Sequence, residues 1–154
     1  GRSVPPQTGT MKLMLNALLL LALVSSACST EGQDVDFCQV LTERAKFEDR
    51  VFKTRIVVVP HYHGAIATAF ECAGLGIGLA DSSIEGSPEL RKLGDEIRRA
   101  YRTQNGPRPR KAVAVRVTAR IEASSHKLRV LDASDWRMVD FAMTVIQPPG
   151  AAEP

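Results

Sequence analysis

Aromatic residues, histidine and cysteine are all scarce in this chain, whose 154 residues include five Phe, two Tyr, one Trp, three His and three Cys. Few aromatic side chains leave few platforms on which nucleic-acid bases could stack. The formal net charge is only +3. It falls further when Arg2 and Lys12 are removed with a predicted leader, which leaves 18 basic against 17 acidic residues. The composition therefore argues against nucleic acid as a partner.

Motifs that identify enzymes are also missing from the sequence. The cysteines lack the Cys-x-x-Cys spacing of redox sites, and no serine stands in a nucleophile elbow. The glycines of the run 74–80 alternate with apolar residues and lack the spacing of a dinucleotide site, which favours a closely packed strand. The length supports one domain at most. We therefore expect a binding or envelope-structural module rather than an enzyme.

The one long apolar stretch lies near the N-terminus. It runs from Leu13 to Val24 and is interrupted only by Asn16. It is too short for a membrane-spanning helix, which needs about 20 residues. With a lysine before it and small residues after it, the stretch predicts a signal peptide over 11–27 and an exported protein. Residues 1–10 are interpreted as a cloning scar or an over-extended start.

The site at which the signal peptide is cleaved can be interpreted in two ways. Residues 25–27 suit general signal peptidase, which would release a soluble periplasmic or secreted protein. Residues 26–28 resemble the bacterial lipobox, in which the cysteine is lipidated and begins the mature chain, although Ser25 replaces the usual Leu. The number of cysteines favours the lipobox, because lipid on Cys28 would leave the other two as one pair. We therefore expect a lipid anchor at Cys28 that holds the protein on a membrane.

Two helices are predicted in the mature chain, after a short polar tether. The first spans about 34–45, with Asp34 as its N-cap. The second begins after Ser87, a natural N-cap, has Pro88 in its first position and ends at the run 104–107. Its apolar stripe consists of Leu90, Leu93, Ile97 and Tyr101.

The rest of the mature chain predicts strands. Pro60 is expected to end the first of them. In the first strand after the second helix, Val and Ile alternate with Arg and Thr, which indicates one buried face. The strands are expected over 51–59, 65–71, 74–80, 113–122, 127–131 and 137–146.

Three strands, one helix and two or three further strands form the element order of the OB fold. We therefore predict a mainly β domain with two helices, an OB-like small Greek-key barrel over 34–146. A generic α+β sandwich is the alternative. The tether would occupy 28–33, and a loose tail would follow over 147–154.

Histidine is the best candidate for chemistry. His61 and His63 lie in the first strand–strand connection, and His126 lies in the late hairpin. In an OB barrel, the loops after the first and fourth strands would lie together at the ligand mouth. Three imidazoles that meet there could bind Zn²⁺ or Cu²⁺. The alternative is that they are ordinary loop residues and that the protein holds no cofactor.

Basic residues form a second candidate site. Arg108, Arg110 and Lys111 stand beside two prolines, and Arg116 and Arg120 follow on one face of the next strand. Such a patch could bind an anionic lipid head group, a glycan or nucleic acid. Alternatively, it is a solvated strand face that protects the edge of the sheet.

Residues 36–80 contain a spaced pattern: Cys38-x-x-Leu41, Phe47-x-x-Arg50, His63-Gly64 and Cys72. The pattern resembles a group of small uncharacterised bacterial exported proteins and lipoproteins. The resemblance implies a secreted or lipid-anchored domain with a bridge between Cys38 and Cys72, and it implies no activity. The leading prediction is thus an exported, lipid-anchored binding or envelope-structural module. A metal-binding protein that uses the loop histidines is the alternative.

Overall fold

A six-stranded sheet organises the second of the two units into which the chain divides, Gly1–Thr30 and Glu31–Pro154. The computed structural model describes residues 1–5, 32–80, 84–104 and 110–142. The strands are β1 (Gln33–Asp34), β2 (Phe52–His61), β3 (Gly64–Thr68), β4 (Ile77–Gly78), β5 (Arg110–Glu122) and β6 (Lys127–Phe141). The helices are α2 (Phe37–Thr42), α3 (Arg44–Phe47), the 3-10 helix η2 (Phe70–Cys72) and α4 (Pro88–Arg102). The prediction of a mainly β domain is therefore confirmed.

The strands follow the order β4-β3-β2-β5-β6, and β1 pairs in parallel with β2. All the other pairs in this order are antiparallel. The two outer strands also touch, because Leu79, just after β4, forms a parallel bridge with Leu128 of β6. The amide of Ala80 donates to the Leu128 carbonyl at 2.9 Å. We call this contact the seam. It joins the two edges of the sheet around a common interior.

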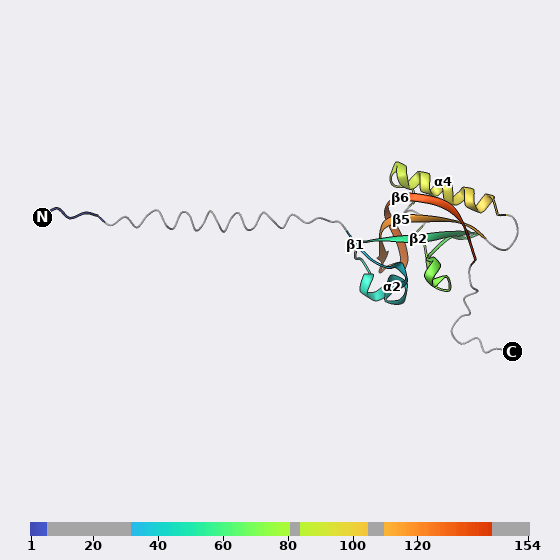
Figure 1. The fold of residues 1–154 in the computed structure, drawn as a ribbon, viewed down its shortest axis with the longest axis horizontal. Helices are drawn as coiled ribbons and strands as arrows, with labels where there is room; N and C mark the ends of the chain where they lie inside the picture. The colour runs from blue at the N-terminus through green and yellow to red at the C-terminus, as the bar shows by residue number, and fades with distance from the viewer. Residues whose placement is uncertain (6–31, 81–83, 105–109, 143–154) are drawn as a thin grey trace. The chain divides into compact units, whose positions relative to one another are not determined.

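That interior is filled from the strands and from two helices. Figure 1 shows α4 along one side of the strands and α2 on the other. Both contribute to the main core: Phe37 and Val40 of α2 and Leu93 of α4 are almost completely buried. The alternating residues of β5 that were predicted to face inward all lie in this core: Val113, Val115, Val117, Ala119 and Ile121. A smaller apolar cluster covers the opposite side of β5 with Ala112, Ala114, Phe141 and two valines of β2.

Helix α4 begins as the sequence predicts. The Ser87 hydroxyl accepts a hydrogen bond from the amide of Leu90, and Pro88 occupies the first helical position. The predicted stripe is wrong at one residue. Tyr101 is 44% exposed, and Ala100 points into the core in its place. The buried residues Leu90, Leu93, Ile97 and Ala100 are spaced three or four apart, so they lie on one face of the helix and Tyr101 lies at its margin.

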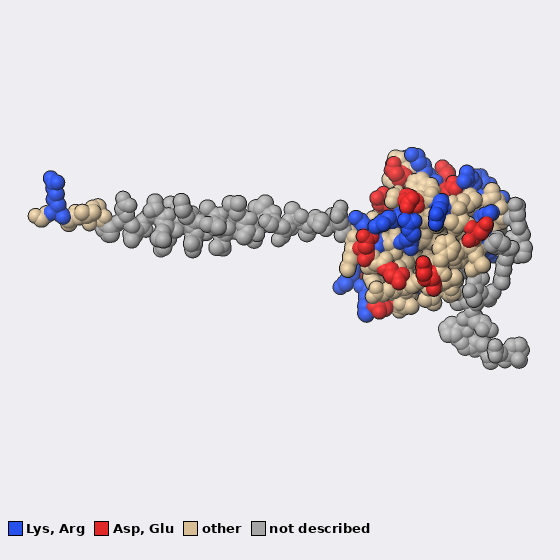
Figure 2. Space-filling model, in the orientation of Figure 1, with Lys and Arg blue, Asp and Glu red and all other residues tan. Residues whose placement is uncertain are grey.

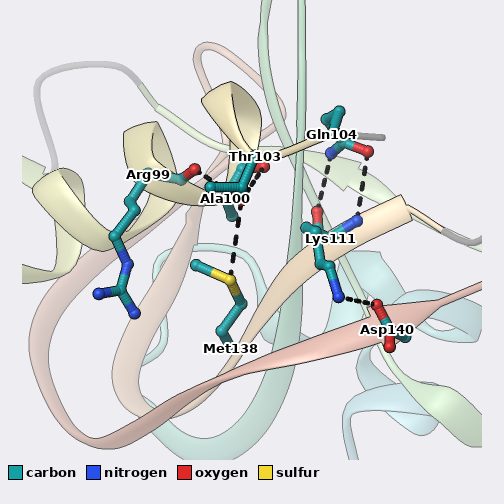
Figure 3. A network of polar contacts seen from close by, with 7 residues as sticks. All are labelled: Arg99, Ala100, Thr103, Gln104, Lys111, Met138 and Asp140. Carbon is teal, nitrogen blue, oxygen red and sulfur yellow. Dashed lines mark hydrogen bonds and ion pairs between the residues drawn. The ribbon is translucent and has the colours of Figure 1, made fainter. Parts of the chain in front are cut away.

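The C-terminal end of α4 is fastened to β5 and β6 (Figure 3). The Gln104 side chain donates to the Lys111 carbonyl and accepts from the Lys111 amide, at 3.0 and 3.2 Å. Lys111 in turn forms an ion pair with Asp140 at 2.6 Å. This arrangement fixes the helix end against the sheet.

The first predicted helix is wrong in its start and in its continuity. Asp36, not Asp34, is the N-cap, since its carboxylate accepts from the amide of Cys38. Asp34 instead belongs to β1, which pairs with β2. The predicted single helix is split at Glu43 into α2 and α3.

Two strand boundaries also differ from the prediction. Pro60 does not end β2 but lies inside it, opposite Ala65 of β3. It lies past Val58, the last residue of β2 that pairs with β5, so its missing N–H costs no ladder bond there. The last two predicted strands are one, β6, with register shifts against β5. A positive φ of 53° at Asp135 accommodates the irregularity.

The glycine run 74–80 was predicted to be a full strand, but only β4 within it is one. The predicted second strand also ends early, at Thr68, and η2 follows. Cys72 of η2 is bridged to Cys38 of α2, with 5.8 Å between their Cα atoms. The predicted disulfide is therefore confirmed.

Candidate ligand-binding site

The three histidines do not converge. His61 ends β2 and His63 lies in the two-residue turn that follows, where its amide donates to Nδ1 of His61 at 3.3 Å. His126 lies in the turn between β5 and β6. Because β2 and β5 are antiparallel, with Phe52 opposite Ala119, these two turns lie at opposite ends of the ladder. Across the residues that the structure describes, no group of three potential ligands could hold a metal ion. The three-histidine zinc or copper site is thus not assembled.

His126 belongs to a polar cluster at the far end of that ladder. Its Nδ1 lies 3.6 Å from a carboxylate oxygen of Glu48. Beside it, Arg129 donates to the carboxylate of Glu122, and the Ser125 hydroxyl donates to the other oxygen at 3.0 Å. The hydrogen bond from Arg129, and then that from Ser125, lowers the pKa of Glu122 below its usual 4.5. These groups satisfy one another, so the cluster holds the turn in place.

The predicted basic patch is neutralised in part. Arg108 lies outside the described residues, Arg110 is exposed, and Lys111 is paired with Asp140. On the neighbouring strand face, Arg116 pairs with Asp34 at 2.8 Å. Basic and acidic side chains are interspersed over the face drawn in Figure 2. This pattern fits the solvated-face interpretation better than an anion site on the sheet.

Cys28, the predicted site of lipidation, and the predicted signal peptide over 11–27 lie outside the described residues, as does the tail 147–154. In the described ranges no helix is both long enough and apolar enough to cross a membrane.

A cavity of about 390 Å³ lies between the β2–β3 hairpin and α4. Small-molecule sites typically have volumes of about 300–1,000 Å³. Its walls come from two short stretches of chain that the fold brings together. The hairpin contributes Pro60, His61, Tyr62, Gly64 and Ala65. The helix contributes Gly94, Ile97, Arg98, Tyr101 and Arg102, and Leu79 and Ile84 complete the lining.

The floor of the cavity is buried and its rim is exposed. Leu79 and Ile97 belong to the main core and are only 4% and 5% exposed. Tyr62, by contrast, is 82% exposed and stacks edge-on against His63, with ring centroids 4.7 Å apart. The cavity thus combines a preformed apolar interior with aromatic side chains at its mouth, a combination typical of binding sites.

Sequence reasoning missed this cavity. One signal was available, because Arg98 and Arg102 are spaced to lie on one face of the helix, beside the predicted apolar stripe. A tyrosine between two histidines in a tight turn was a second. Neither signal could identify a cavity, since its shape depends on how the hairpin packs against α4.

A scan against protein-family models and searches of curated proteins and of solved structures found nothing that matches this chain. The functional assignment therefore depends on the residues and their geometry.

Proposed function

We propose that this chain is an exported, lipid-anchored module that binds a small molecule and has no catalytic role, built on an OB-like barrel. The cavity between the β2–β3 hairpin and α4 is the observation that carries the proposal. Its interior is apolar, it is open to solvent, and its floor is part of the core, so a ligand could enter without unfolding the domain.

The strand pairing supports the OB-like barrel. Strands β2, β3 and β4 form a meander, α4 follows, and β5 returns to pair with the other side of β2. The seam between Leu79 and Leu128 then closes the sheet through a parallel contact. The OB fold is a five-stranded, partly open Greek-key barrel, and this order of strand pairs supports such a barrel. A sandwich of separate layers would leave the β4 and β6 edges apart.

The disulfide supports export. Disulfides persist in oxidising compartments and are rare in the reducing cytosol. With Cys38 and Cys72 bridged, Cys28 is left as the only other cysteine, and a lipid on its sulfur would remove the last free thiol. We propose that this lipid holds the domain at a membrane.

The anchor is tested by replacing Cys28 with Ser and fractionating the cells. We expect the wild-type protein in the membrane fraction with lipid on the Cys28 peptide, and the variant in the soluble exported fraction. The same distribution for both proteins would contradict the anchor.

Binding is tested with Nile red, an uncharged apolar dye, on the purified Cys28→Ser protein. We expect saturable binding with a blue-shifted emission. Ala65→Leu, which places a larger side chain in the cavity wall, should weaken it, whereas Ala45→Leu on exposed α3 should not. Folded protein without saturable binding would overturn the proposed function.

A further inference from the structure

The cavity has two chemically distinct parts, and together they restrict its ligand. Its inner wall is aliphatic, formed by Leu79, Ile84, Ile97 and Ala65. A hydrocarbon chain gains free energy on leaving water for such a wall, whereas a sugar or a nucleotide would leave its polar groups without partners there.

The rim carries a positive charge that no described residue neutralises. Arg98 and Arg102 are one helical turn apart, so both reach the same side of α4. Arg98 is paired with Asp95 at 2.6 Å. Arg102 forms neither an ion pair nor a side-chain hydrogen bond with any other described residue. No described residue that lines the cavity is acidic.

The other groups at the rim do not offset this charge. Nδ1 of His61 already accepts the amide hydrogen of His63. Tyr62 and Tyr101 are exposed and bring hydroxyl groups, not carboxylates, to the rim. The rim therefore favours a negative group, and a guanidinium binds a carboxylate with well-defined geometry.

We propose that the cavity binds a single-chain amphiphile with an anionic head group, a fatty acid, with its chain against Leu79 and Ile97 and its carboxylate at Arg102. This inference rests on the proposed function, since it specifies the ligand of the same cavity. Arg102 also lies in the last turn of α4, where a cation offsets the helix dipole. The test therefore measures stability as well as binding.

The experiment titrates the purified Cys28→Ser protein by calorimetry with three ligands of equal chain length: decanoate, decanol and decyltrimethylammonium. The two charged ligands are kept below their micelle concentrations and decanol below its solubility limit. We expect decanoate to bind about tenfold more tightly than decanol, because one charge-assisted hydrogen bond is gained. The cationic ligand should bind most weakly. Shortening the fatty acid to octanoate should cost about fourfold in affinity for each methylene removed.

Two variants distinguish the contribution of the ligand's head group to affinity from that of its hydrocarbon chain. Arg102→Gln should reduce decanoate binding about tenfold and leave decanol binding unchanged. Lys92→Gln, an exposed cation on the same helix that does not line the cavity, is the matched control and should change neither. Thermal melting of each variant shows whether the domain remains folded.

The outcomes distinguish the two proposals. If decanoate and decanol bind equally, or if folded Arg102→Gln retains decanoate affinity, the fatty-acid inference is overturned while the small-molecule cavity stands. If Nile red binds but none of the three amphiphiles does, the inference fails in the same way. If neither the dye nor any amphiphile binds the folded protein, the proposed function itself fails.

Discussion

The strands on the two sides of β2 are stabilised by different kinds of contact. On one side, β5 and β6 are paired along almost their whole length, from Arg110 opposite Phe141 to Glu122 opposite Lys127. On the other side, β3 and β4 share only two pairs, Ile66 with Gly78 and Ala67 with Ile77. On the β5–β6 side, stability therefore comes from many backbone pairs of the same kind.

The β3–β4 side depends on a few specific contacts instead. The disulfide fastens η2 to α2. The Thr68 hydroxyl donates to the Leu75 carbonyl at 2.6 Å, and the Arg44 guanidinium donates to the Gly76 carbonyl at 2.6 Å. Where a ladder is short, side chains and covalent bonds must position the backbone. Single substitutions should therefore have large effects on this side and small effects on the other.

The largest effect should come from removing the disulfide. Replacing Cys38 and Cys72 with Ala should lower the free energy of unfolding by about 3–4 kcal/mol, because the bridge closes a loop of 34 residues in the unfolded chain. Urea unfolding of the oxidised wild type and the double variant measures the difference. A decrease in the free energy of unfolding of less than about 1 kcal/mol would show that the short β3–β4 ladder is stable without the disulfide.

Thr68→Val should have the next largest effect. The Thr68 side chain is completely buried, so the substitution leaves the Leu75 carbonyl without its donor at a cost of about 1–3 kcal/mol. Thr118→Val on β5 is the matched control, because that hydroxyl makes no hydrogen bond with any described residue. The control should change the free energy of unfolding by less than about 0.5 kcal/mol. Equal effects at both positions would contradict the comparison.

A pair of glycines makes a finer comparison within the same segment. A Cβ at Gly76 would lie 2.6 Å from Cγ2 of Ile66, whereas a Cβ at Gly78 would have Cγ of Lys127 as its nearest neighbour, at 3.8 Å. Gly76→Ala should therefore destabilise by about 1 kcal/mol or more through overpacking. Gly78→Ala should not destabilise. Thermal melting of the two variants side by side is sufficient, and the reverse order would refute the packing argument.

The smallest effect on the free energy of unfolding should come from replacing Glu122, in the polar cluster at the turn between β5 and β6. It should be seen at neutral pH and not in strong acid. Because Arg129 lowers the pKa of Glu122 in the folded state, ionised Glu122 stabilises the fold above its usual pKa of 4.5. That contribution is lost as the pH falls through the lowered pKa. Glu122→Gln should thus be less stable than wild type at neutral pH and equal to it in strong acid. A difference that does not change with pH would exclude the ion pair as its cause.

The sequence predicted the elements whose signals are local. Ser87 and Pro88 mark the start of α4 because capping depends on neighbouring residues, and the alternation in β5 reports its buried face directly. The sequence did not predict that Pro60 stays within β2 or that Asp34 joins β1, since both depend on which partner strand lies alongside. The length of strand β4 was overestimated because the glycines of its segment fit a strand and a loop equally well.

Site prediction failed for a related reason. The histidines were grouped by assuming that two loops meet, but the register of β2 with β5 places those loops apart. The cavity was missed because Tyr62 and Arg102 are distant in sequence and become neighbours only when the hairpin packs against α4. The disulfide was predicted because the resemblance implied it and because lipid on Cys28 would leave Cys38 and Cys72 as one pair.

The seam has a consequence for motion within the folded state. It joins a residue before α4 to a residue of β6, so it closes a loop of chain that contains both α4 and β5. Contacts that rest on few hydrogen bonds are among those that open most readily in local fluctuations. Leu79 lies both beside the seam and in the cavity wall. We therefore expect the cavity to widen when the seam opens, and hydrogen exchange at the amide of Ala80, which donates across the seam, would report that opening.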